Sequence, residues 1–180
     1  MIKIGPVGLG KQLPHNHTDW DENGHSEIVQ IFVSHGDSNK INSIQFQYSE
    51  DGTLELSKRY GESSGHTFDV VRLDYPSEYL TWVSCRVVIG TFGAFGDGIS
   101  SLTFGTNRTK RGPFGCPTEG DREFRIQLGP ERQFGGFHGT TIDNRDRLGS
   151  IGVYLKPIKT LGKFQDKSAS PSVFGAEGRV

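Results

Sequence analysis

The chain has 180 residues, with 25 glycines, 12 phenylalanines and a formal net charge of −1. This length predicts one domain, and the nearly balanced charge gives no general attraction to nucleic acid or to anionic lipid, so neither is expected as a partner. The sequence has no run of membrane length and no apolar secretory segment near its start, so we expect a cytoplasmic or nuclear protein that is not secreted. Cys85 and Cys116 are too few for a disulfide framework and are expected to be free thiols.

Strand signals follow one another along the chain. Alternating apolar residues, or dense β-branched and aromatic residues, predict strands at 28–33, 44–48, 53–56, 68–73, 80–89, 99–104, 124–128, 133–138 and 150–156. The Asp51-Gly52 pair between two alternating runs indicates a hairpin. Apolar residues nowhere recur at helical spacing over three turns, so the sequence predicts an all-β protein.

The character of the sequence changes after Pro157. Residues 158–180 are mostly polar and contain two aromatic residues, Phe164 and Phe174. We expect residues 1–157 to form the domain and 158–180 to form a flexible extension through which a protein partner could bind. The alternative for the first few residues of this extension is a short arm packed on the domain.

One short sequence motif occurs three times in the chain. An aliphatic residue, a serine two places on, another aliphatic residue and then a further hydrophobic residue recur around Ser43, Ser101 and Ser150. The copies are about 50 to 60 residues apart, a length that suits a block of about four strands. The repeat predicts three sheets with approximate threefold symmetry, with equivalent strands carrying Ile44, Phe46, Leu102, Phe104, Ile151 and Val153.

Motifs spread along the chain resemble those of plant jacalin-related lectins. They are Ile4-Gly5-Pro6, Trp20-Asp21, Pro76-Ser77-Glu78-Tyr79-Leu80, Gly112-Pro113-Phe114-Gly115, and Phe137-His138-Gly139 followed by Ser150-Ile151-Gly152-Val153-Tyr154. The resemblance covers residues 2–157 and implies a β-prism of three four-stranded Greek-key sheets around a hydrophobic axis. The Ile-Gly-Pro-Val-Gly opening and the carboxy-terminal extension are most similar to the plant jacalin-like proteins that restrict long-distance potyvirus movement.

The resemblance also implies a hexose site at one end of the prism. The family pattern there is Gly-x-x-x-Asp before the last strand, and the Asp carboxylate accepts hydrogen bonds from two sugar hydroxyls. This chain has Arg145 and Gly149 at those two positions. A substitute carboxylate could come from Asp143 or Asp146, although both could equally be solvated turn residues.

Two further loops complete the expected site. The amino-terminal loop around Gly10 lacks the Gly-Gly pair that is common in the family. The loop at 90–98 offers Phe92 or Phe95 for stacking on a sugar face, or both aromatic rings could instead pack into the end of the prism. We therefore predict a carbohydrate site made from Gly10, Phe95, Asp143, Asp146 and Arg147.

Other chemistries receive less support from the sequence. Residues 5–12 approach a phosphate-binding pattern, but no helix follows, so we interpret them as a turn. Five metal-capable side chains lie close together without a known ligand spacing, and we interpret them as part of a solvated irregular loop: His15, His17, Asp19, Asp21 and His25. No motif places a nucleophile beside a base, so we expect neither an enzyme nor a cofactor.

Two functions remain. The first is a lectin-like protein of plant defence, including antiviral restriction, that binds a mannose- or glucose-type hexose weakly and gains avidity as a homo-oligomer. The second is a protein-interaction module that keeps the fold and has lost sugar binding. Gly149 and the extension after Pro157 favour the second hypothesis.

Overall fold

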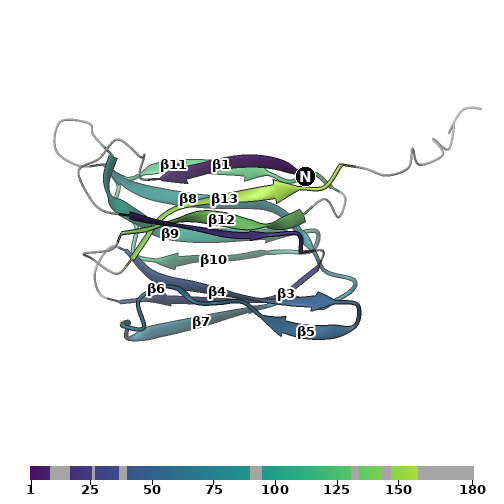
Figure 1. Cartoon of the computed structure of the whole chain (residues 1–180). Coiled ribbons are helices and arrows are strands. Elements are labelled where there is room, and N and C mark those ends of the chain that lie inside the picture. The colour runs from purple at the N-terminus through teal and green to yellow at the C-terminus, as the bar shows by residue number, and fades with distance from the viewer. Residues whose placement is uncertain are drawn as a thin grey trace, which may run out of the picture.

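A computed structural model describes residues 1–8, 17–25, 27–36, 40–89, 95–130, 134–142 and 147–157, apart from the side chains of 89 and 95–97. The prediction of an all-β protein is confirmed, because every regular element in these ranges is a strand (Figure 1). The same ranges contain no helix long and apolar enough to span a membrane. Cys85 and Cys116 are both free, as expected.

The strands form three antiparallel sheets, which we name A, B and C. Sheet A has the order β1 (Ile2–Gly8), β13 (Arg147–Leu155), β12 (Phe134–Ile142), β2 (His17–Asn23). Sheet B has the order β5 (Thr53–Leu56), β4 (Ile41–Glu50), β3 (Glu27–His35), β7 (Thr67–Arg72), and β6 (Tyr60–Gly61) also pairs with β4. Sheet C has the order β10 (Lys110–Gly115), β9 (Phe95–Thr106), β8 (Leu80–Ile89), β11 (Arg122–Gln127).

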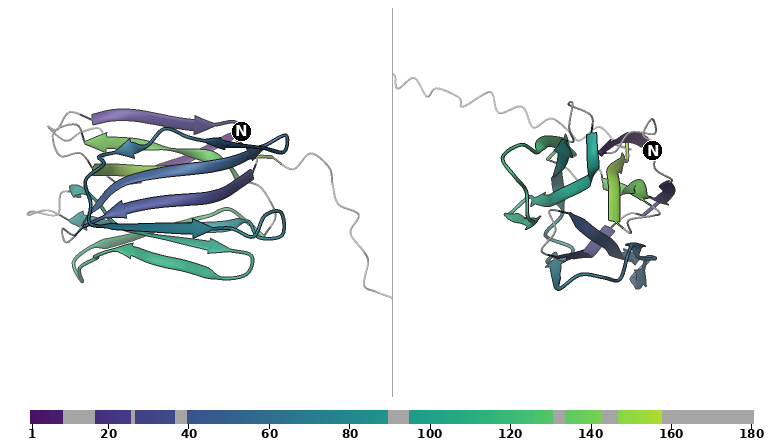
Figure 2. Two further views of the ribbon diagram at one scale, coloured as in Figure 1. Left: turned by 90° about the horizontal axis from the view of Figure 1, so that it is seen from below. Right: turned by 90° about the vertical axis from the view of Figure 1, so that its left-hand side faces the viewer.

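The three sheets surround a common axis, so the prediction of a β-prism is confirmed (Figure 2). Sheets B and C are each built from strands that follow one another in the chain, whereas sheet A joins the two ends of the domain. The view along the axis shows sheet B in blue, sheet C in teal and green, and sheet A in purple and yellow-green. In each sheet the strands are antiparallel but not in sequence order, which is the Greek-key arrangement.

The repeated sequence motif occupies the same place in each sheet. Strands β4, β9 and β13 each lie second in their sheet, next to the strand at one edge. The six predicted core residues on these strands are all at most 1% exposed: Ile44, Phe46, Leu102, Phe104, Ile151 and Val153. The repeat therefore identified both the symmetry and the inward face.

Each repeated serine lies against a glycine on the neighbouring edge strand. Gly61 pairs with Ser43, Gly115 with Ser101 and Gly8 with Ser150, and all three glycines have positive φ values. A β-carbon added at Gly61, Gly115 or Gly8 would lie 2.0, 2.3 or 2.5 Å from a carbonyl oxygen of the neighbouring strand. Only glycine fits at these three equivalent positions.

Phenylalanines from all three sheets meet on the axis. Phe137 of sheet A stacks on Phe46 of sheet B, with ring centroids 4.5 Å apart, and meets Phe104 of sheet C edge-on at 6.4 Å. Phe46 and Phe104 are equivalent in the repeat, where sheet A has the smaller Val153. Phe137 is paired with Val153 across the sheet and supplies the missing aromatic ring.

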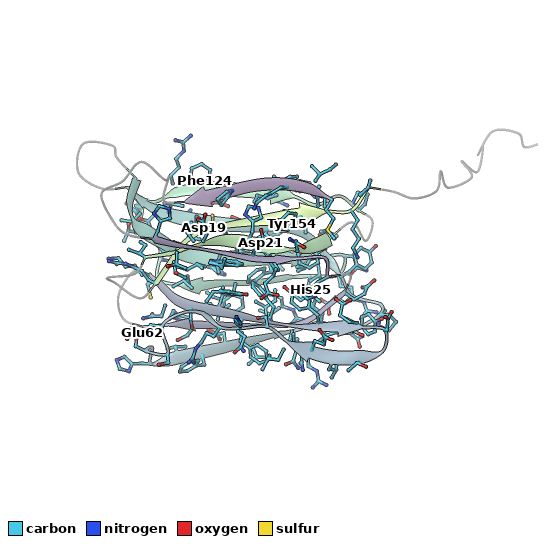
Figure 3. The ribbon with its side chains drawn as sticks, viewed as in Figure 1. Asp19, Asp21, His25, Glu62, Phe124 and Tyr154 are labelled. Atoms are coloured by element: carbon cyan, nitrogen blue, oxygen red, sulfur yellow. The ribbon has the colours of Figure 1, made fainter. Side chains whose placement is uncertain are left out.

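A polar network on the outer face of sheet A connects its four strands, and Figure 3 labels two of its members, Asp21 and Tyr154. Lys3 of β1 forms an ion pair with Asp21 of β2 at 3.1 Å, and the Tyr154 hydroxyl of β13 donates to the same carboxylate. His138 of β12 lies 3.0 Å from the Ile4 carbonyl oxygen, and burial lowers the pKa of its imidazole. Burial alone would raise the pKa of Asp21, but its hydrogen bonds to Tyr154 and Lys3 outweigh burial and lower it.

The structure also corrects two sequence-based interpretations. Residues 5–8 belong to strand β1, not to a turn, and residues 17–23 form strand β2 where an irregular loop was expected. A Gly-Pro pair obscures the strand pattern in β1 and again in β10, and the strand pairing is irregular at both places. Trp20 is the only buried residue of strand β2, so the sequence of this strand shows almost no apolar alternation.

We expect Gly115→Ala to reduce the free energy of unfolding by roughly 2 to 5 kcal/mol, because the new β-carbon would meet the Ser100 carbonyl oxygen at a positive φ. Chemical denaturation followed by tryptophan fluorescence would measure this loss. Gly120→Ala is the matched control, because a β-carbon there meets nothing within 4 Å. Equal stability of the two variants would contradict the constraint.

Truncation after Pro157 should leave the domain folded. Strand β13 ends at Leu155 and is already paired on both sides, with β1 and with β12. We expect the melting temperature, followed by circular dichroism, to change by only a few degrees, while self-association or partner binding weakens. Loss of folding would show that residues 158–180 form part of the prism.

Candidate functional site

Three strands that carry the predicted loops meet at one end of the prism. Strand β1 ends at Gly8, just before residues 9–16. Gly98 lies in strand β9, which begins directly after residues 90–94, and strand β13 begins directly after residues 143–146. A β-carbon at Gly98 would lie 2.6 Å from the Leu148 carbonyl oxygen, and one at Gly8 would lie 2.5 Å from the Gly149 carbonyl oxygen. The backbones at the bases of all three loops are therefore in close contact.

The predicted site residues fall on or beside these strands. Gly10, Asp143 and Asp146 lie outside the described residues. Phe95 is the first residue of β9 and pairs with Ile89, and its side chain is also outside the described part. Arg147 is the first residue of β13, pairs with Ile142 and is 7% exposed, which places a buried cation at the base of the site.

Position 149 carries a feature that the sequence does not reveal. A β-carbon added at Gly149 would lie 2.8 Å from the Thr140 hydroxyl oxygen and 3.2 Å from a side-chain carbon of Ile142. Thr140 is 4% exposed, and its hydroxyl is held 2.8 Å from the Ser150 hydroxyl. The space that an aspartate would need is therefore occupied by the opposite strand.

The described residues at this end of the prism are mainly closely packed backbone. Gly149 leaves no carboxylate at this position of the last strand. Within the described ranges, no three His, Cys, Asp or Glu side chains are grouped to hold a metal ion. Burial raises the pKa of the Cys85 thiol to about 12, so Cys85 remains protonated at neutral pH.

The sequence and the fold both match one family of known proteins. Residues 4–154 match the family described as the jacalin-like lectin domain. The chain is 43% identical to Protein RESTRICTED TEV MOVEMENT 1 of Arabidopsis thaliana over 169 residues, which cover 93% of this chain and 94% of the relative. It is 44% identical to Jacalin-related lectin 2 of the same plant over 163 residues, covering 87% and 86%.

A solved structure shows the same fold. The mannose-specific jacalin-related lectin from Morus nigra, in complex with mannose, superposes with a TM-score of 0.68 at 27% sequence identity. The match covers 87% of this chain and 94% of the Morus protein.

Proposed function

This chain belongs to the jacalin-like lectin family, and we propose that it binds a hexose of the mannose or glucose type weakly at the prism end described above. The observation that carries the proposal is the convergence of Gly8, Gly98 and the peptide of residues 148–149, which places the bases of three loops together. We assign the contacts to Gly10, Phe95, Asp143, Asp146 and Arg147.

The binding should be weak for two reasons. The hydroxyls of a free hexose are fully hydrated, so only a surplus over water hydrogen bonds contributes to affinity. A carboxylate at position 149 would provide the stronger, charge-assisted bonds, and this chain has glycine there. The mannose-bound relative supports the choice of a mannose-type hexose.

The biological role that we propose is plant defence, including restriction of virus movement. It is supported by the similarity to a protein named for restricted movement of TEV, which extends over nearly the whole of both chains.

Titration calorimetry should detect methyl α-mannoside with a Kd on the order of 1 mM. Gly149→Asp combined with Thr140→Ala should tighten binding by about tenfold or more, because the second change removes the closest obstacle to the new carboxylate. Gly149→Asn with Thr140→Ala is the control, which adds similar volume without charge.

A glycan array with no response of the natural protein to any mannose, glucose or galactose structure would refute hexose binding. If the aspartate variant then gained binding that the natural protein lacks, the second candidate function would be favoured instead. That candidate is a protein-interaction module built on the lectin fold.

The outer face of sheet B offers a surface for the self-association that multivalent sugar binding needs. Leu54 and Leu56 of β5, and Phe68 and Val70 of β7, are 56% to 61% exposed. With Tyr75, they make up five of the seven exposed large hydrophobic side chains in the described part of the chain. Leu54 and Val70 also line one hollow, and exposed apolar side chains gathered on one face are typical of interaction sites.

We infer that the occupant of this face is a second copy of the chain. A hollow of about 620 Å³ on this side is lined by Leu54, Val70 and Tyr75 and also by residues of both charge signs. Arg72 and Asp74 lie in the same lining, so a twofold axis would place opposite charges against each other. Such a dimer would also present two sugar sites and increase avidity.

Analytical ultracentrifugation should show a concentration-dependent dimer that is lost when Leu54 and Phe68 are both changed to serine. Both side chains are 61% exposed, so folding should be unaffected. Ile2→Ser is the control, because Ile2 is 57% exposed on sheet A. A natural protein that remains monomeric at high concentration would contradict this interface.

A further inference from the structure

The outer face of sheet C contains a polar hollow of about 270 Å³. Its floor is formed by small side chains of the two central strands, β8 and β9, and its walls rise from the edge strands and from the connection after β10. The lining residues are Ser84, Arg86, Ser101, Thr103, Lys110, Pro113, Pro117 and Glu123. The volume is just below the usual range for drug-sized ligands, so it suits a single small ring.

Two hydroxyls lie on the floor of this hollow. Ser101 is 2% exposed and Thr103 is 8% exposed, and both line the hollow. Because both hydroxyls line the hollow, a ligand seated there would exchange hydrogen bonds with them in place of water.

The equivalent serine in sheet A has a different neighbour from Ser101. There Ser150 lies opposite Thr140, and the two hydroxyls bond to each other at 2.8 Å. In sheet C the residue opposite Ser101 is Arg86, whose guanidinium instead lies 3.6 Å from the Glu123 carboxylate. The Arg86 side chain is therefore directed toward Glu123.

Glu123 is held in place at the wall of the hollow. Its carboxylate accepts a hydrogen bond from the Ser84 hydroxyl at 2.9 Å and also faces Arg86. A fixed carboxylate can accept from two adjacent hydroxyls of a ligand, while Lys110 on the other side offers donors. Pro113 and Pro117 add apolar surface to the same lining.

This mixture of groups matches a sugar better than an anion. Each sugar hydroxyl both donates and accepts, as do the hydroxyls of Ser101 and Thr103. Lys110 and Arg86 would attract a phosphate, but the Glu123 carboxylate in the same lining would oppose it, whereas a neutral sugar meets no such opposition. The hollow also differs from the one on sheet A, where Lys3, Asp21 and Tyr154 already satisfy one another.

We propose that the outer face of sheet C holds a second saccharide site, separate from the prism end. It takes one neutral hexose ring, whose hydroxyls bond to Ser101, Thr103 and the Glu123 carboxylate. The site uses none of the residues assigned at the prism end, so the two proposals stand or fall independently. Together they would allow one chain to bind two sugars of a branched glycan.

The test is a nitrogen-15 NMR titration of the full-length protein with methyl α-mannoside, methyl β-galactoside and inorganic phosphate. We expect at least one of the two glycosides to shift the amide signals of Ser84, Ser101 and Thr103. Shifts confined to Gly8, Gly98 and Leu148 would support the prism-end site and overturn the second site. A response of the sheet C signals to phosphate but not to the glycosides would replace it with an anion site and overturn the proposal.

Two variants identify the contacts. Thr103→Val removes the hydroxyl with little change in shape, and Glu123→Gln removes the charge from a side chain that is 54% exposed. Each should weaken glycoside binding at sheet C by about tenfold. Thr53→Val, an exposed threonine on sheet B, is the matched control and should have no effect. Unchanged affinity in the folded Glu123→Gln variant would overturn the proposal even if Thr103→Val failed to fold.

Discussion

The prism depends on close contacts between three glycines and the backbone of the neighbouring strand. Gly8, Gly61 and Gly115 leave no room for a β-carbon beside the peptide that precedes each repeated serine. Because backbone atoms cannot be compressed, each contact fixes where the edge strand ends and where the next connection begins. The connection after Gly8 leads to the prism end, and the connection after Gly115 carries Pro117 into the hollow on sheet C. The same constraint therefore closes the fold and positions both candidate sites.

The sequence revealed the interior of the molecule better than its edges. The repeat around Ser43, Ser101 and Ser150 can be recognised in the sequence because inward-facing residues on equivalent strands must fill the same space. The edge strands β1 and β10 were missed because a Gly-Pro pair interrupts each of them, and edge strands tolerate proline where central ones do not. Strand β2 was missed because Trp20 is its only buried residue, and one large apolar residue does not make an alternating pattern.

The sequence predicted the candidate site only in part, for a different reason. The sequence shows that position 149 has glycine where the family has aspartate. It does not show that the Thr140 hydroxyl would obstruct an aspartate at this position. Thr140 reaches Gly149 only through the pairing of β12 with β13, and this pairing shifts between Thr140 and Thr141. A shift of one residue moves a side chain to the other face of the sheet, so no spacing rule could have placed the Thr140 hydroxyl there.

The threefold symmetry that holds inside the prism is broken on its outer faces, and a single row of residues across each sheet shows how. Beside the repeated serine, the next two strands carry Thr140 and Asp19 in sheet A, Ser34 and Phe68 in sheet B, and Arg86 and Glu123 in sheet C. In sheet A the threonine hydroxyl is hydrogen-bonded to the serine hydroxyl. In sheet B the phenylalanine contributes to an apolar face, and in sheet C an Arg–Glu ion pair lies beside the serine. Packing requires the inward residues of the three sheets to agree, whereas nothing in the fold requires the outward ones to do so. Side-chain differences on a shared backbone are therefore sufficient to give one small domain three chemically distinct faces.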